Sequence, residues 1–74
     1  MIKLQVLCSK GDEDFEAQNI TEAQELLAKV ELGEVEGIEK GKYYIVDKTT
    51  NQIIGRRDIQ EGQMLVVVPV IAGG

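Results

Sequence analysis

The chain has 74 residues, 43% of them hydrophobic, which is enough for one small domain with a single core and too many for a disordered segment. Its 13 acidic and 8 basic residues give a net charge of −5, so it lacks the basic footprint that nucleic acid or an anionic membrane requires. Its only cysteine is Cys8, so an internal disulfide is excluded. It has no histidine, the residue that most often serves as a metal ligand or a general base.

The apolar segments are short for secretion or membrane insertion. Residues 1–4 carry no signal-peptide core, and the longest apolar run, residues 64–72, has nine residues. We therefore expect a cytoplasmic protein with no membrane partner, no nucleic-acid partner and no metal site.

Near the amino terminus, apolar side chains alternate with polar ones, at Ile2, Leu4, Val6 and Cys8. This period of two predicts a half-buried first strand, in which Cys8 is a small core residue rather than a reactive thiol. Residues 9–12 are typical of a turn, and a short second strand is expected at about residues 15–19. The acidic run over residues 12–16 lacks the spacing of a calcium loop, so we interpret it as a solvated hairpin.

A helix is predicted over about residues 22–32. Thr21 and Gln24 have the spacing of a capping box, in which each side chain bonds the other residue's backbone N–H. Gly33 supplies the stop, because glycine readily adopts the left-handed conformation that ends a helix. One apolar stripe follows the helical period, at Ala23, Leu26, Leu27 and Val30.

The second half of the chain predicts three more strands. Glycines make residues 33–41 irregular, and Ile59 is expected to be an apolar plug in a tight connection over residues 58–63. The predicted strands are residues 42–48, residues 52–54 after a turn at residues 49–51, and residues 64–70.

The order of these elements predicts an α+β fold. A single helix must cover the apolar face of the sheet, so we expect a mixed sheet of four to five strands with the helix across one face. This arrangement resembles the β-grasp fold of ubiquitin-like proteins. We expect one domain over residues 1–74, with residues 70–74 as a flexible tail.

The last strand breaks the alternation that a half-covered sheet requires, because residues 64–71 are apolar without interruption. Either Leu65 and Val67, or the set Met64, Val66 and Val68, must point away from the helix. That outward set is either shaded by neighbours such as Tyr43 or Tyr44, or it is a patch on which a partner docks.

The sequence after this strand favours docking. Gly73 and Gly74 lack side chains, so the tail can extend through a narrow tunnel and present the Gly74 carboxylate in another protein's active site. We expect Ala72 and Gly73 to be the threaded residues and Met64, Val66, Val68 and Val70 to form the docking surface.

Residues 61–74 resemble the C-terminal part of the small sulfur-carrier proteins of thiamine and molybdopterin biosynthesis, which are ubiquitin-like folds ending in Gly-Gly. The ending over residues 70–74 is most similar to that of the thiamine carrier, and residues 51–56 are similar to its hairpin. Residues 1–4 instead resemble the start of the molybdopterin synthase small subunit, so the pathway stays open.

The resemblance implies that an E1-like adenylyltransferase transfers AMP from ATP to the Gly74 carboxylate. A sulfur donor then displaces AMP and leaves a thiocarboxylate, which a biosynthetic enzyme accepts. The chain itself is then a carried substrate and not an enzyme, a monomer on its own, without a cofactor; ATP and magnesium belong to the partner.

Two alternatives share parts of this pattern. A ubiquitin-like protein modifier uses the same adenylate but passes Gly74 to a lysine. A structural domain, such as a phage tail assembly protein, needs no reactive tail. The pair Arg56 and Arg57 could contact an acidic partner loop, but side chains beside a turn are expected to be solvated.

Overall fold

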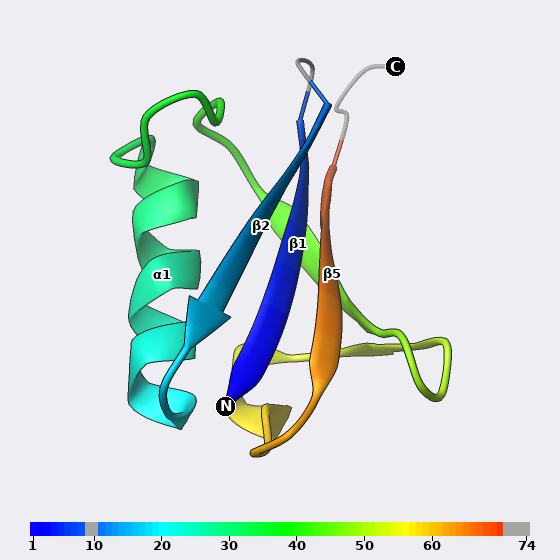
Figure 1. Cartoon of the computed structure of the whole chain (residues 1–74). Coiled ribbons are helices and arrows are strands. Elements are labelled where there is room, and N and C mark those ends of the chain that lie inside the picture. Colours follow the sequence, from blue (N-terminus) through cyan, green and yellow to red (C-terminus); the bar gives the residue numbers. More distant parts are fainter. Residues whose placement is uncertain (9–10, 71–74) are drawn as a thin grey trace.

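A computed structural model describes residues 1–8 and 11–70 of the chain. Within them, one α-helix lies across one face of a five-stranded sheet (Figure 1). The elements are β1 (Ile2–Cys8), β2 (Gly11–Ala17), α1 (Ile20–Leu32), β3 (Tyr43–Asp47), β4 (Gln52–Ile54), the short 3₁₀ turn η1 (Arg56–Asp58) and β5 (Met64–Pro69).

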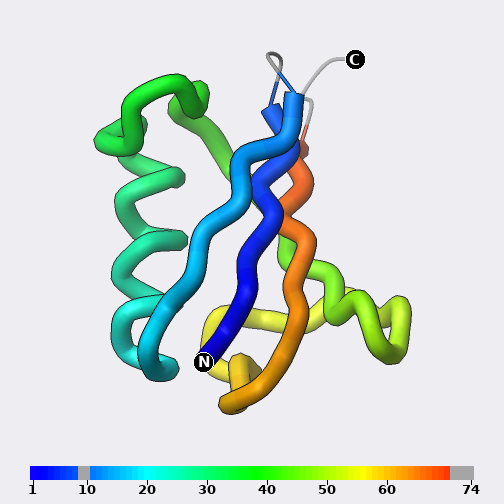
Figure 2. The backbone as a smooth tube through the Cα atoms, viewed as in Figure 1, coloured from blue at the N-terminus to red at the C-terminus, as the bar shows by residue number. Residues whose placement is uncertain are grey.

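The strand order in the sheet is β2-β1-β5-β3-β4. β1 and β5 lie side by side at its centre and are parallel, whereas the other neighbouring pairs are antiparallel (Figure 2). The first and last strands of the chain are therefore neighbours in the middle of the sheet, as in a β-grasp fold. The predicted α+β class, mixed sheet and single covering helix are confirmed.

β2 is longer and begins earlier than the sequence predicts. It pairs with β1 along its whole length, from Cys8 opposite Gly11 to Ile2 opposite Ala17. Its acidic residues favour loops by composition, but they lie on an edge strand where water solvates them, so backbone pairing determines the local structure. Residues 18 and 19, predicted to be strand, instead lead into the helix.

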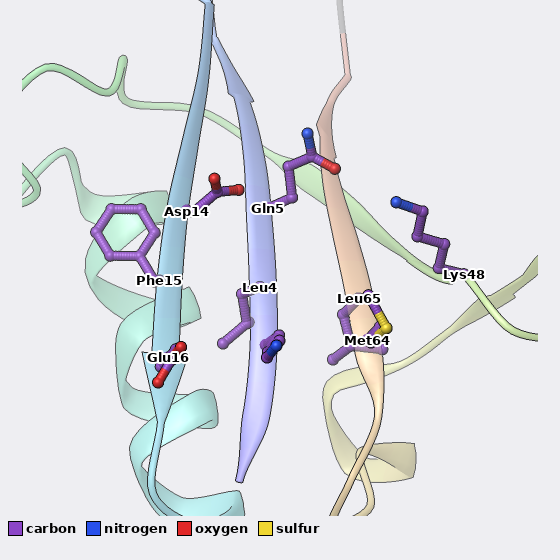
Figure 3. A pocket seen from close by; sticks show the side chains of 9 residues that line it. Leu4, Gln5, Asp14, Phe15, Glu16, Lys48, Met64 and Leu65 are labelled. Atoms are coloured by element: carbon purple, nitrogen blue, oxygen red, sulfur yellow. The ribbon is translucent and has the colours of Figure 1, made fainter.

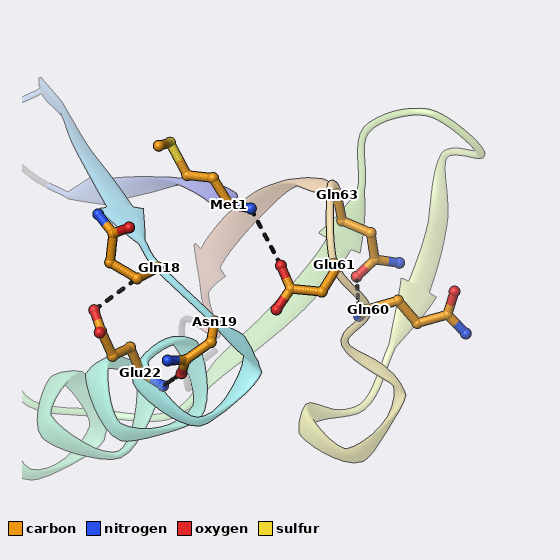
Figure 4. A network of polar contacts seen from close by, with 7 residues as sticks. All are labelled: Met1, Gln18, Asn19, Glu22, Gln60, Glu61 and Gln63. Atoms are coloured by element: carbon orange, nitrogen blue, oxygen red, sulfur yellow. Dashed lines mark hydrogen bonds and ion pairs between the residues drawn. The ribbon is translucent and has the colours of Figure 1, made fainter.

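The helix begins two residues before the predicted start, and the predicted capping box at Thr21 and Gln24 is wrong. Asn19 is the N-cap: its side-chain Oδ1 accepts from the Glu22 backbone N–H at 2.9 Å (Figure 4). Asparagine caps more strongly than threonine, and the earlier start adds Ile20 to the side chains packed on the core. Gln24 instead donates its amide to the Arg56 carbonyl, at 3.0 Å.

Gly33 ends the helix as predicted. Its φ of 74° is left-handed, and its N–H bonds the carbonyls of Lys29 and Val30. A Cβ at this position would lie 2.8 Å from the Lys40 Cβ, so the space as well as the backbone angle requires glycine.

The core lies between α1 and the inner face of the sheet. The predicted plug Ile59 is confirmed, with 3% of its surface exposed, and Ile38 from the irregular segment after the helix is also part of the core. The remaining buried apolar residues come from the strands and the helix: Ile2, Leu4, Val6, Ala17, Ala23, Leu27, Val30, Ile45, Leu65 and Val67.

The connection before β5 is held by polar contacts at the start of β1. The Met1 amino group lies 3.1 Å from Glu61 Oε2, and Gln63 Oε1 accepts from the Gln60 backbone N–H at 2.8 Å (Figure 4). The Lys3 backbone N–H also donates to the Gln63 carbonyl, at 3.0 Å. These contacts tie the connection to the start of β1, next to the point at which β5 enters the sheet.

Candidate functional site

The unbroken apolar sequence of β5 divides cleanly between two faces. Leu65 and Val67 are buried against the helix side of the sheet. Met64, Val66 and Val68 point to the other face, which α1 does not cover and which we call the open face; 46% of Met64 is exposed there. The sequence left open which of the two sets of residues points away from the helix, and in the structure it is Met64, Val66 and Val68.

Neighbouring strands extend the apolar surface. Val66 lies between Gln5 on β1 and Val46 on β3, and Tyr44 lies opposite Val68. Tyr44 is 39% exposed, and Ile53 on β4, opposite Val46, is 70% exposed. We define the open-face patch as Met64, Val66, Val68, Tyr44, Val46 and Ile53.

The shading expected for the outward set is present in part. Val66 and Val68 are half-buried, so their neighbours do shade them, and Tyr44 rather than Tyr43 lies opposite Val68 on this face. Tyr43 instead packs against the core. The patch as a whole nonetheless stays open to solvent at Tyr44, Ile53 and Met64.

Three members of the patch, Tyr44, Val46 and Ile53, were not predicted as site residues. A signal for two of them was present, because Tyr44 and Val46 are two residues apart and must share a face of one strand. Ile53 could be assigned only from its register with Val46, which the sequence of β4 does not reveal.

The opposite margin of the open face is acidic. Asp12, Asp14 and Glu16 alternate along β2, and we call them the acidic row. They lie opposite Leu7, Gln5 and Lys3 of β1 in turn, so all three share the open face. Gln5 donates its amide to Asp12 Oδ2 at 2.9 Å.

A shallow hollow of about 360 Å³ separates part of the acidic row from the patch. Its open-face walls include Asp14 and Glu16 on one side and Met64 and Lys48 on the other (Figure 3). Gln5 projects between Asp14 and Lys48. The hollow therefore offers carboxylate, ammonium and thioether groups within one depression.

The predicted tail starts where β5 ends. Val70 is 48% exposed, and its backbone N–H donates to the Lys42 carbonyl at 2.9 Å, which continues the pairing with the β3 side. The predicted reactive residue Gly74 and the predicted threading residues Ala72 and Gly73 lie outside the described residues.

Cys8 is half-buried rather than fully buried as expected, because it is the last residue of β1. Its thiol donates to the Gly11 carbonyl, with Sγ and the oxygen 2.9 Å apart. Arg56 and Arg57 are exposed, as expected for side chains beside a turn, and Arg56 lies 3.8 Å from the Glu31 carboxylate.

Two polar residues near the patch have structural partners. Asp47 is buried, and its carboxylate accepts from the Thr49 backbone N–H at 2.9 Å and from the Gln63 amide at 3.1 Å. The Tyr43 hydroxyl donates to the Glu39 carbonyl at 2.6 Å. Burial, then the nearby Glu39 and Cys8, raise the pKa of Tyr43 above its ordinary value.

Among residues 1–8 and 11–70, no group of three histidine, cysteine, aspartate or glutamate side chains is placed to hold a metal ion. Over the same residues, no helix is both long and apolar enough to cross a membrane. What the described surface offers chemically is an apolar face with a charged margin, which suits binding to a protein surface.

The fold places the chain among small α+β domains of β-grasp topology. No family model, curated protein or solved structure matches the chain.

Proposed function

We propose that this protein is a cytoplasmic sulfur carrier whose Gly74 carboxylate is activated by an E1-like adenylyltransferase and converted to a thiocarboxylate. The observation that carries the proposal is the outward apolar set of β5, whose strand runs on in sequence to Gly73 and Gly74. An apolar face beside a side-chain-free tail suits a carboxylate that another protein must hold and modify.

Activation is needed because a carboxylate is a poor electrophile: its charge repels nucleophiles, and oxide is a poor leaving group. Attack of a Gly74 oxygen on the α-phosphate of ATP gives an acyl-adenylate and releases pyrophosphate. Hydrosulfide then attacks the acyl carbon, AMP leaves, and Gly74 carries a thiocarboxylate. A persulfide donor gives the same product once a second thiol has reduced the acyl disulfide that forms first.

The roles proposed for this chain are those of a substrate. Gly74 supplies the reacting carboxylate, Gly73 and Ala72 pass through the partner's tunnel, and Met64, Val66, Val68 and Val70 dock on the partner. The adenylyltransferase supplies ATP, magnesium and the catalytic groups. A sulfur-accepting enzyme of thiamine or molybdopterin synthesis then uses the product.

The proposal requires a free carboxylate on Gly74. The same requirement applies to a protein modifier, which shares the chemistry up to the adenylate. A purely structural role does not require this carboxylate, so it predicts that the protein still performs its role in assembly after removal of Gly73 and Gly74.

The test is ATP–pyrophosphate exchange catalysed by the E1-like adenylyltransferase of the native host. We expect exchange with the wild-type chain and none after deletion of Gly74. Val70→Asp should weaken exchange, because Val70 is exposed beside the tail, whereas the control Leu32→Asp, at an exposed apolar residue that ends α1, should not. Absence of exchange with the wild-type chain would contradict the proposed function.

A further inference from the structure

We propose that the open face binds a partner surface with basic side chains opposite Asp12 and Asp14, and with acidic side chains opposite Lys3 and Lys48. This inference rests on the proposed function, because the partner is the protein that takes up the tail. It adds the chemistry of that partner and the orientation in which it docks.

The acidic row is aligned by strand geometry. Cys8 to Ile2 pair with Gly11 to Ala17 without a bulge, so Asp12, Asp14 and Glu16 fall on one face. Alternate residues of a strand are about 7 Å apart, which is a spacing that arginine or lysine side chains on a facing surface can match.

These charges have few partners within the chain. Over the described residues, neither of the ion pairs found involves Asp14, Glu16, Lys3 or Lys48. Asp12 is bonded to the Gln5 amide, which is neutral and so brings no opposite charge to it. Charges of both signs thus remain available on one surface that also carries the apolar patch.

The charges are also distributed unevenly along the strands. Asp12 lies beside Leu7, toward the end of the sheet at which β5 gives way to the tail. Lys3 lies opposite both Glu16 and Met64 at the other end, and Lys48 bonds the Met64 carbonyl through its backbone N–H. The β1–β2 side of the face is therefore acidic near the tail and mixed with basic groups at the far end, whereas on the β3 side the exposed residue Lys42 lies beside Val70 and accepts its backbone N–H.

A second copy of the chain fits this face poorly. Each copy has a net charge of −5 and presents the same acidic row. Like charges brought together at an interface are unfavourable, whereas a basic partner gains both attraction and faster association. The occupant that the charges favour is a different protein with a basic strip beside the entrance for the tail.

Two adjacent residues give a matched test. Asp14 points to the open face, whereas Glu13 lies opposite buried Val6 and so points to the other side of the same strand. Asp14→Lys and Glu13→Lys change the net charge equally. We compare their KM values with that of the wild-type chain in the pyrophosphate exchange reaction of the host's adenylyltransferase.

Asp14→Lys should raise KM about tenfold at about 0.05 M salt, and by much less at about 0.5 M, where screening shortens the range of the charges. Glu13→Lys should stay within about twofold of the wild-type chain at both concentrations. Circular dichroism checks that both variants fold.

Equal KM values for the two variants would overturn the docking orientation while leaving the carrier function intact. Absence of exchange with every chain, including the wild-type chain, would instead refute the proposed function and this inference with it. Sedimentation equilibrium of the protein alone tests the second copy: a dimer that Ile53→Asp disperses would show that the patch binds itself, which also overturns the inference.

Discussion

Val66 and Val67 are neighbours in β5, yet they lie on opposite faces of the sheet. Val67 is 0% exposed, between Val6 and Ile45, whereas Val66 faces outward between Gln5 and Val46. The same residue type therefore contributes to the core at one position and to the candidate docking surface at the next.

This relationship predicts unequal costs for the same substitution. Val67→Ala should lower the free energy of unfolding by about 2 kcal/mol, because two buried methyl groups are lost and a cavity is left. Val66→Ala should lower it by less than about 1 kcal/mol, because the side chain is only half-buried. Urea denaturation of both variants measures the difference; equal losses would contradict the unequal burial, and a larger loss for Val66→Ala would show that β5 is assigned the wrong faces.

The sequence could not decide between these faces, because an unbroken apolar strand has no period of its own. The choice comes from pairing: Leu65 lies opposite Leu4 and Val67 opposite Val6, so the clear alternation of β1 determines that of β5. The same long-range pairing joins Ile53 to the patch, through Val46.

Outside β5, local sequence patterns were sufficient to predict the elements, except for the start of the helix and the length of β2. The helix and its stop at Gly33 followed from periodicity and glycine, and Met64, Val66 and Val68 share one outward face, as their spacing requires. The start of the helix differs from the prediction because Asn19, which lies before the Thr21 and Gln24 spacing, is the residue that caps it. The length of β2 was underestimated because pairing with β1 outweighs its acidic composition.

The corrected helix start can be tested directly. Asn19→Ala should destabilise the protein by about 1 kcal/mol, because the Glu22 backbone N–H loses its acceptor. Thr21→Ala should change stability by less than about 0.5 kcal/mol, because Thr21 is exposed within the first turn and does not cap it. Thermal denaturation of the two variants decides; a larger loss for Thr21→Ala would restore the capping box predicted from the sequence.

Tyr43→Phe should show a pH-dependent effect on stability. Near neutral pH the variant should be less stable by about 1 kcal/mol, because the hydrogen bond to the Glu39 carbonyl is lost. The folded state raises the pKa of Tyr43 above 10.0, so above that pH the unfolded wild-type chain loses this proton first. The stability of the wild-type chain then falls with rising pH.

Phenylalanine has no proton to lose, so the stability difference between the wild-type chain and Tyr43→Phe should shrink as the pH rises through the raised pKa. Urea denaturation at neutral pH and above pH 10 measures it. A difference that stays constant or grows would show that the folded state does not raise the pKa of Tyr43.

Cys8→Ser should preserve sulfur transfer, because Cys8 lies at the end of β1 and bonds the Gly11 carbonyl, a contact that a serine hydroxyl can also make. The yield of thiocarboxylate formed with the adenylyltransferase and a sulfur donor is the readout. Complete loss of product in a folded variant would give Cys8 a chemical role.

The most direct test of the carrier function is the intact mass of the protein purified from its native host. Replacement of one Gly74 oxygen by sulfur predicts a species heavier by about 16 Da, with the added mass in the C-terminal peptide, and its loss after Gly74 is deleted. Lysine-linked adducts through Gly74 would identify a modifier instead. A carboxylate that remains unmodified while the sulfur-dependent pathway is active would contradict the carrier function.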